Sequence, residues 1–117
     1  LLADDEAALV GAVAPQLRRA GHTVFSALSA AESRDLFARF GAELDVAVID
    51  VRLGDGDGRQ LAEEFRDARP ELGIVLISAS GARTVPNLGR RALLLEKPFD
   101  FKQLRGAIER ARSRPAR

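Results

Sequence analysis

The chain has 117 residues, 46% of them hydrophobic and 30% charged, which fits one globular domain with a single core. Its formal net charge of +1 gives no bulk attraction to nucleic acid, and no apolar run approaches the roughly 20 residues of a membrane-spanning helix. The cysteine count of 0 excludes disulfides and thiolate chemistry and agrees with a reducing compartment. Because the methionine count is also 0, we expect residues to precede Leu1 in the full protein.

Strand and helix patterns alternate five times along the chain. Short apolar runs bounded by loop residues predict buried parallel strands at 1–3, 23–27, 46–50, 74–78 and 93–96. Helical spacing of apolar residues predicts helices that begin after Asp5, at Ser29, after the loop 51–58 and at Asp100. Pro15 should weaken the first helix, and Gly21 suits its end.

The stretch 79–92 contains Gly81, Pro86 and Gly89 and has little apolar periodicity. It predicts a short or irregular fourth helix that orders poorly and becomes ordered on activation. The whole pattern predicts an α/β fold with a doubly wound five-stranded parallel sheet over residues 1–112. Residues 113–117 would be a frayed tail or the start of a linker.

Polar residues follow four of these strands and form one chemical set. Asp4 and Asp5 follow the first run, Asp50 ends the third, Ser78 ends the fourth, and Lys97 follows the fifth. The carboxyl ends of parallel strands form the ligand-binding edge of such sheets, so these side chains should converge. Neighbouring carboxylates stay ionised together when a hard cation such as Mg²⁺, or Mn²⁺ in its place, joins them. The set predicts an aspartate that accepts a phosphoryl group with a metal and a lysine beside it.

Each residue also has a purely structural interpretation. Asp4 and Asp5 could cap the first helix, Asp50 and Ser78 could be turn residues, and Lys97 could form a surface ion pair. Lys-Pro at a strand end is less easily explained this way, because Pro98 permits a cis bond that could direct the ammonium inward. The four features together make coincidence improbable.

The chain resembles the receiver domain of bacterial response regulators over nearly its whole length. The matching motifs are Leu-Leu-Ala-Asp4-Asp5-Glu6, Ala-Gly21-His22-Thr23-Val24, Val-Ile-Asp50-Val-Arg-Leu, Asp57-Gly58, Ile-Ser78-Ala79 and Glu-Lys97-Pro98-Phe99. The resemblance implies a flavodoxin-like fold and a cytoplasmic switch that a histidine kinase or phosphotransfer protein phosphorylates on Asp50. It implies no enzyme activity beyond the domain's own phosphorylation and dephosphorylation.

The resemblance also assigns roles to single residues. Asp5, Asp50 and the backbone carbonyl of Arg52 would bind Mg²⁺ directly, and Asp4 through water. The Ser78 hydroxyl, the Ala79 backbone and Lys97 would bind the phosphoryl oxygens. Gly58 would supply a loop conformation that other residues resist, and Pro98 the geometry of the loop after Lys97.

Three departures from the family pattern stand out. Arg52 is a bulky cation two positions after Asp50, and Gly54 stands where proline is frequent. Leu94 occupies the switch position where many members carry Tyr or Phe, which puts the usual switch with Ser78 in question. The interval between Ser78 and Lys97 is also a few residues shorter than usual.

Other functions fit less well. A receiver-like interaction domain that works without phosphorylation is the main alternative. A phosphatase with an aspartyl-phosphate intermediate would need an acid at Arg52, and a flavin carrier would need a phosphate loop where the acidic residues Asp4, Asp5 and Glu6 lie.

We expect no membrane contact and no direct nucleic-acid binding; the kinase, the output partner and the oligomeric state cannot be predicted from the sequence.

Overall fold

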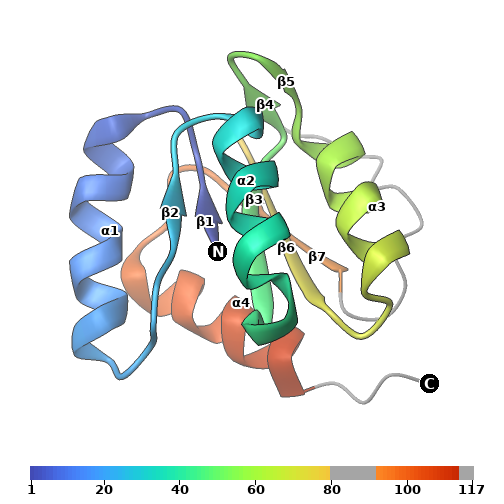
Figure 1. Cartoon of the computed structure of the whole chain (residues 1–117). Helices are drawn as coiled ribbons and strands as arrows, with labels where there is room; N and C mark the ends of the chain where they lie inside the picture. The colour runs from blue at the N-terminus through green and yellow to red at the C-terminus, as the bar shows by residue number, and fades with distance from the viewer. Residues whose placement is uncertain (80–91, 114–117) are drawn as a thin grey trace.

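The structure is a computed structural model that describes residues 1–79 and 92–113. In chain order its elements are β1 (Leu2–Ala3), α1 (Ala7–Arg19), β2 (Ser26–Ala27), α2 (Ala30–Phe40), the 3₁₀ turn η1 (Gly41–Glu43), β3 (Val46–Asp50), β4 (Arg52–Leu53), β5 (Gly56–Asp57), α3 (Gly58–Ala68), β6 (Gly73–Ser78), β7 (Ala92–Glu96) and α4 (Phe101–Ser113). Figure 1 shows these elements. The predicted short fourth helix falls on residues 80–91, outside the described residues.

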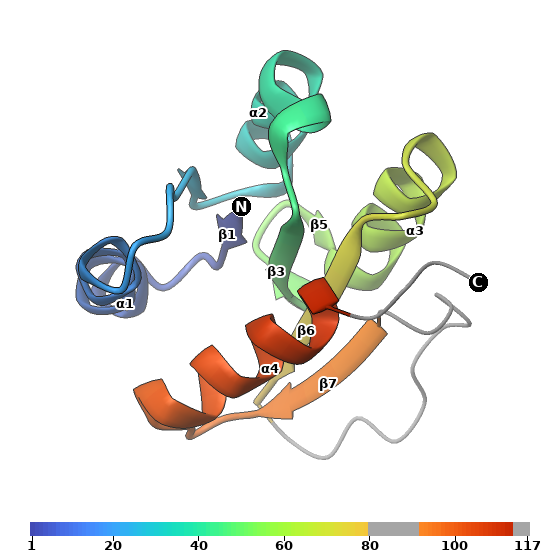
Figure 2. The same cartoon turned by 90° about the horizontal axis from the view of Figure 1, so that it is seen from below.

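Five of the strands form one parallel sheet in the order β2-β1-β3-β6-β7. Helices α1 and α4 cover one face of this sheet, and α2 and α3 cover the other, as the view from below shows (Figure 2). Helices on both faces of a parallel sheet define a doubly wound α/β fold. The predicted fold is therefore confirmed.

The core consists of two apolar clusters, one on each face of the sheet. Alternation along each strand divides the side chains between them. In β6, Ile74 and Leu76 pack toward the α2–α3 side, while Val75 and Ile77 pack toward the α1–α4 side. The helices contribute buried apolar residues to both clusters: Leu17, Leu61, Ala62, Phe65, Leu104, Ala107, Ile108 and Ala111.

The helix ends follow the sequence signals closely. Gly21, with φ +100°, lies in the left-handed region that favours glycine just beyond α1, and Pro15 lies inside that helix. The Ser29 side chain accepts a hydrogen bond from the Glu32 amide and so caps α2. Asp100 and Gln103 exchange side-chain and backbone hydrogen bonds before α4, which is a capping box.

The sequence interpretation was wrong in three places. The second strand covers only Ser26–Ala27, which pair with Leu2 and Ala3 of β1, although the Phe25 carbonyl also accepts a hydrogen bond from the Leu2 amide. The stretch 51–58 is not a plain loop, since β4 and β5 pair in it as a short antiparallel hairpin. The last strand, β7, is only partly buried because it lies at the sheet edge beside β6.

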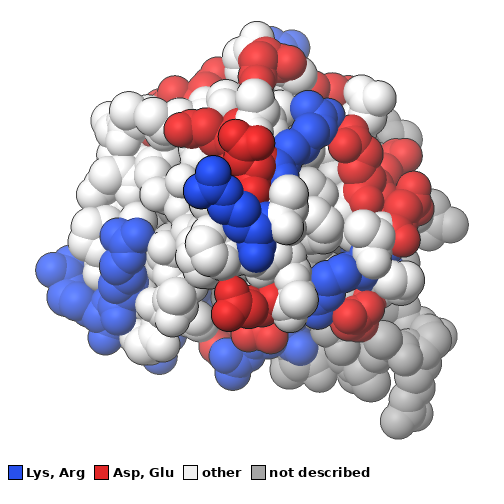
Figure 3. All heavy atoms as spheres, viewed as in Figure 1, with Lys and Arg blue, Asp and Glu red and all other residues white. Residues whose placement is uncertain are grey.

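Charge is mixed over the face seen in Figure 3, where acidic and basic side chains alternate. A basic group at the lower left lies over the end of α1, whose last turn carries Arg18 and Arg19. Within the described residues, no helix combines the length and the apolar character needed to cross a bilayer.

Candidate functional site

The polar residues predicted to converge do meet at the carboxyl ends of the parallel strands. Asp4 directly follows β1, Asp50 ends β3, Ser78 ends β6, and Lys97 directly follows β7. These strands are neighbours in the sheet, and the Lys97 amide donates a hydrogen bond of 2.8 Å to the Ser78 carbonyl. The shared edge of the sheet thus brings residues 93 positions apart into one site.

Asp50 is held by two contacts at the end of a fully buried strand. The residue is only 5% exposed. Its Oδ1 accepts a hydrogen bond of 2.8 Å from the Arg52 amide, and its Oδ2 accepts one of 2.8 Å from Lys97 Nζ. A carboxylate fixed in this way has a defined orientation toward any group that approaches the edge of the sheet.

Asp4 is completely buried, with an exposed fraction of 0%. Its Oδ1 accepts a hydrogen bond of 2.9 Å from the Glu6 amide. Its Oδ2 lies 3.0 Å from Lys97 Nζ, in an ion pair that lacks the alignment of a hydrogen bond. Burial raises the pKa of the Asp4 carboxyl, although the Glu6 amide and the Lys97 ammonium oppose this shift. The N-cap residue of α1 is Glu6, so Asp4 and Asp5 do not cap that helix.

Asp4, Asp5 and Asp50 together form a cluster that could hold a metal ion. Each offers a carboxylate oxygen, and the three oxygens lie within 4.8 Å of one another. Asp5 is exposed while Asp4 and Asp50 are buried, so one side of the cluster is open to solvent. A set of oxygen ligands suits a hard divalent cation, and the buried Asp4 Oδ2 has an unmet hydrogen-bonding capacity that a cation or its water could satisfy. The donor set therefore fits a metal.

Lys97 is the cation that contacts three acids of the site. Its Nζ lies 2.8 Å from Asp50 Oδ2, 2.8 Å from Glu6 Oε1 and 3.0 Å from Asp4 Oδ2. Burial alone would lower the pKa of Lys97, but the hydrogen bonds with Asp50 and Glu6 and the ion pair with Asp4 outweigh it and hold that pKa above its ordinary value. The ammonium therefore stays charged. The Lys97–Pro98 bond is cis.

Gly58 is required for a different reason from the one predicted. Its φ is not positive, since Gly21 alone has a positive φ among the described glycines. A Cβ at Gly58 would instead lie 1.8 Å from the Asp50 carbonyl oxygen, because the start of α3 packs directly on the end of β3. The Gly58 amide also donates a hydrogen bond of 2.9 Å to the Val51 carbonyl. The missing side chain allows this close approach to the backbone of Asp50.

Two contacts of acidic residues, one in the hairpin after β3 and one at Lys97, were not predicted. Asp55, at the turn between β4 and β5, accepts hydrogen bonds from the Ala30 and Ala31 amides at the start of α2, at 2.7 and 3.0 Å. These hydrogen bonds lower the pKa of Asp55. Glu6 contacts Lys97, although the sequence interpretation gave it no role. The only sequence signal for these contacts is that Asp55 and Glu6 are acidic. Each contact joins distant parts of the chain, so no local pattern predicts it.

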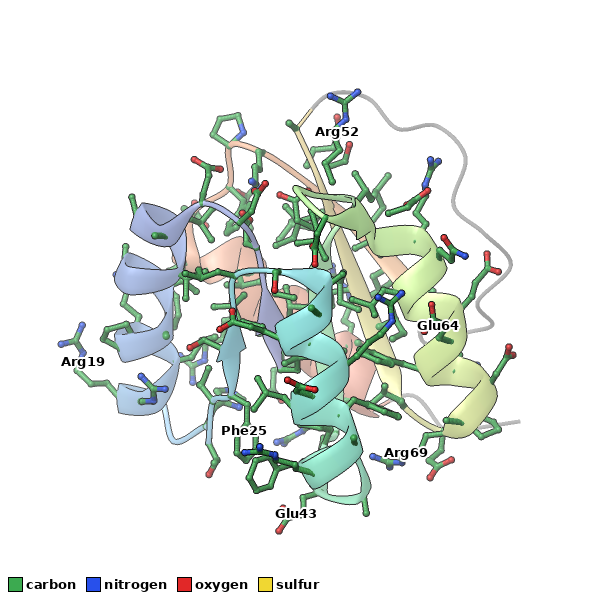
Figure 4. The ribbon with its side chains drawn as sticks, turned by 45° about the horizontal axis from the view of Figure 1, so that its top comes forward. Arg19, Phe25, Glu43, Arg52, Glu64 and Arg69 are labelled. Atoms are coloured by element: carbon green, nitrogen blue, oxygen red, sulfur yellow. The ribbon has the colours of Figure 1, made fainter. Side chains whose placement is uncertain are left out.

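The remaining predicted residues lie near the site with less defined contacts. Ser78 is buried at 2% exposure, and Ala79 after it is exposed. Arg52 is exposed, and its side chain lies at the top of the view in Figure 4. Leu94 is opposite Leu76 in the sheet and packs on the α2–α3 side of the core. The roles of these side chains, and of the Arg52 carbonyl, stay predictions.

Comparison with known proteins identifies the family. The family model described as the response regulator receiver domain matches residues 1–109. The chain belongs to the response regulator receiver domain family. Receiver domains are signalling domains of bacterial two-component systems, which agrees with the resemblance seen in the sequence motifs.

Individual relatives agree with this assignment. The receiver domain is 32% identical over 120 residues to the DNA-binding transcriptional regulator NtrC of Rhizobium meliloti (strain 1021), covering 100% of this chain and 24% of NtrC. It is 31% identical over 113 residues to the sensor kinase CckA of Brucella abortus (strain 2308), covering 93% of this chain and 12% of CckA. The chain thus spans a quarter or less of these relatives.

Solved structures give the same result. A response regulator receiver protein from Sinorhizobium medicae WSM419 aligns with a TM-score of 0.83 and 35% identity over 94% of this chain and 90% of that one. The receiver domain of NtrX from Brucella abortus aligns with a TM-score of 0.81 and 29% identity, covering 94% of both chains. The five-stranded sheet and its helices are therefore those of a receiver domain.

Proposed function

We propose that Asp50 of this receiver domain accepts a phosphoryl group in a Mg²⁺-dependent reaction, and that the modified domain presents a changed surface to a partner or an output domain. The observation that carries this proposal is the convergence on Asp50 of a metal-fitting carboxylate cluster and the ammonium of Lys97. A negatively charged nucleophile and a negatively charged donor need both positive groups in order to approach each other.

Each residue has a defined part in this chemistry. A carboxylate oxygen of Asp50 attacks the phosphorus and forms a new O–P bond while the bond between phosphorus and the donor breaks, and its electron pair leaves with the donor's imidazole nitrogen or, from acetyl phosphate, with acetate. Mg²⁺, or Mn²⁺, when bound by Asp4, Asp5, Asp50 and the Arg52 carbonyl, would supply positive charge at the transferred group. Lys97 and Ser78 would donate hydrogen bonds to the phosphoryl oxygens, together with the Ala79 backbone.

The donor and the cellular context are part of the same proposal. A histidine kinase or a phosphotransfer protein would supply the phosphoryl group from a phosphohistidine, in the cytoplasm. The similarity to parts of NtrC and CckA is compatible with a receiver attached to a regulator or to a kinase. The domain would act on its own aspartyl phosphate and on no separate substrate.

Phosphorylation is tested with acetyl phosphate as the donor. The wild-type domain, incubated with acetyl phosphate and Mg²⁺, should gain the mass of one phosphoryl group, and the gain should disappear with excess chelator. Asp50→Asn should abolish the gain, whereas Asp67→Asn, at an exposed position on α3, should leave it unchanged. Equal labelling of the Asp50→Asn and wild-type domains would refute the assignment of Asp50, whereas no labelling of the wild type would favour a receiver-like interaction domain.

Metal binding is tested separately by an NMR titration with Mg²⁺. Amide signals of Asp5, Asp50 and Arg52 should shift and saturate, because the cluster lies beside these residues. Binding should be weak, since an open three-carboxylate site leaves several positions of the cation to water. A titration without saturable shifts at these three amides would remove the metal from the proposal.

A further inference from the structure

Glu6 contacts the same ammonium as the metal-fitting carboxylates but does not belong to their cluster. Its Oε1 lies 2.8 Å from Lys97 Nζ, as close as Asp50 Oδ2. Glu6 precedes the first turn of α1, and its side chain is 60% exposed, whereas the side chains of Asp4 and Asp50 are 0% and 7% exposed. The ammonium is therefore shared between two buried acids and one exposed acid.

The three acids differ in how firmly they are fixed. Asp4 accepts the Glu6 amide through Oδ1, and Asp50 accepts the Arg52 amide through Oδ1. Within residues 1–79 and 92–113, the Glu6 carboxylate has Lys97 as its one ion-pair partner. Moving an exposed carboxylate from an ion pair into water costs little, while moving a buried one is costly. Glu6 is thus the acid that can leave Lys97 most easily.

A phosphoryl group on Asp50 would change what the ammonium binds. An ammonium has three N–H donors: Glu6 and Asp50 accept one hydrogen bond each, and Asp4 Oδ2 lies 3.0 Å from the same nitrogen as the third acid around it. The phosphoryl oxygens carry more negative charge than a carboxylate and would lie beside Lys97. The phosphoryl oxygens can accept the Lys97 N–H that Glu6 now accepts, and the contacts of the buried Asp4 and Asp50 with Lys97 can remain.

We propose that Glu6 is a positioning residue that holds Lys97 in the unphosphorylated domain and competes with phosphoryl oxygens for it. This inference rests on the proposed function, because it requires a phosphoryl group on Asp50. The competition lowers the affinity of the domain for a phosphoryl group by the cost of separating Glu6 from Lys97. Glu6 therefore sets how easily the phosphorylated state forms and how long it lasts.

The test compares Glu6→Gln with Glu96→Gln. Both variants remove one negative charge close to Lys97, but Glu96 lies at the exposed end of β7 and is not among the described acids that contact the ammonium. Both positions are exposed, so both variants should fold. Beryllofluoride is titrated into each Mg²⁺-saturated domain as a phosphoryl mimic, and binding is followed by amide NMR.

We expect Glu6→Gln to bind beryllofluoride about two- to five-fold more tightly than wild type, the range that an exposed ion pair supports. Glu96→Gln should bind as wild type does. With lysine-labelled protein, the Lys97 side-chain signal of metal-free Glu6→Gln should also move toward its position in the beryllofluoride complex. A change in general stability alone would not produce that shift.

The possible failures can be told apart. If Glu6→Gln and Glu96→Gln bind beryllofluoride equally, or if Glu6→Gln binds more weakly than wild type, the competition is refuted while the proposed function stands. If acetyl phosphate does not label wild-type Asp50 and beryllofluoride does not bind, both the proposed function and this inference are wrong.

Discussion

The strand that carries the acceptor and the strand that carries the cation are held very differently. Strand β3 is buried at all of its positions and pairs with β1 and β6, so Asp50 ends a strand that is supported on both sides. Strand β7 is partly buried, and β6 is its one neighbour among the described strands. The proposed nucleophile needs a fixed position, whereas a cation that would pass from carboxylates to phosphoryl oxygens needs some freedom. The different support of the two strands suits these two proposed roles.

The largest effect should come from filling the space beside the acceptor. Gly58→Ala would place a Cβ 1.8 Å from the Asp50 carbonyl oxygen, so either β3 or α3 must shift. We expect a loss of about 3 kcal/mol or more in the free energy of unfolding, measured by urea denaturation. Gly11→Ala is the matched control, because a Cβ in that part of α1 meets nothing within 4 Å and should stabilise the helix by about 0.5–1 kcal/mol. Similar changes in both variants would mean that the end of β3 is not rigid.

Removing the cation should have the next largest effect. Lys97→Met leaves the buried Asp4 and Asp50 carboxylates without their shared ammonium, so we expect a loss of about 1–3 kcal/mol in metal-free buffer. Lys102→Met, at an exposed position of α4, should change stability by less than about 0.5 kcal/mol. Added Mg²⁺ should restore more stability to Lys97→Met than to wild type. Equal stability of the two variants without metal would show that Lys97 does not hold the acids together.

A smaller, pH-dependent effect should follow from Asp4. Burial raises the pKa of this carboxyl above 3.8, so the folded domain retains a proton that the unfolded chain loses first. Asp4 therefore costs no stability below about pH 3.8; its cost grows as the pH rises from there and levels off above the folded-state pKa. In metal-free buffer, Asp4→Asn should be more stable than wild type at neutral pH, and the two should converge on acidification. Urea denaturation over a pH series, with Asp67→Asn as the control, measures this; a constant difference at every pH would contradict it.

The smallest effect should come from the hairpin that follows β3. Asp55→Asn replaces one acceptor of the α2 amides with a donor, so the hairpin should separate from α2 while the fold persists. Amide hydrogen exchange at Ala30 and Ala31 should become faster. The same measurement on Asp35→Asn, an exposed acid of α2, should show no change. Unaltered exchange at both alanines would mean that Asp55 does not anchor the loop after the acceptor.

Much of this molecule follows from local sequence signals. Apolar runs predicted β3, β6 and β7, helical spacing predicted the buried faces of α3 and α4, and the residues after each strand predicted which groups meet. These predictions depend on short stretches and on one rule of parallel sheets, that carboxyl ends share an edge.

The features that were missed depend on contacts between distant residues. The Asp55 contact joins residues 25 positions apart, and the contact between Lys97 and Glu6 joins residues 91 positions apart. No local pattern encodes such pairs. The two-residue strands β4 and β5 are too short to show alternation, and the position of β7 at the sheet edge depends on strand order. The requirement for Gly58 was predicted but its cause was not, because only the packing of α3 on β3 reveals the close approach.

The lysine distribution gives the domain a chemical reporter of its own state. Its only lysines are Lys97, whose pKa is held above the ordinary value, and the exposed Lys102. Reagents that acylate amines attack the neutral, nucleophilic form, so Lys102 should be modified long before Lys97. The ratio of the peptide modified at Lys97 to the peptide modified at Lys102 then reports how tightly the carboxylates or phosphoryl oxygens hold the Lys97 ammonium. Unlabelled protein at low concentration suffices for such a measurement.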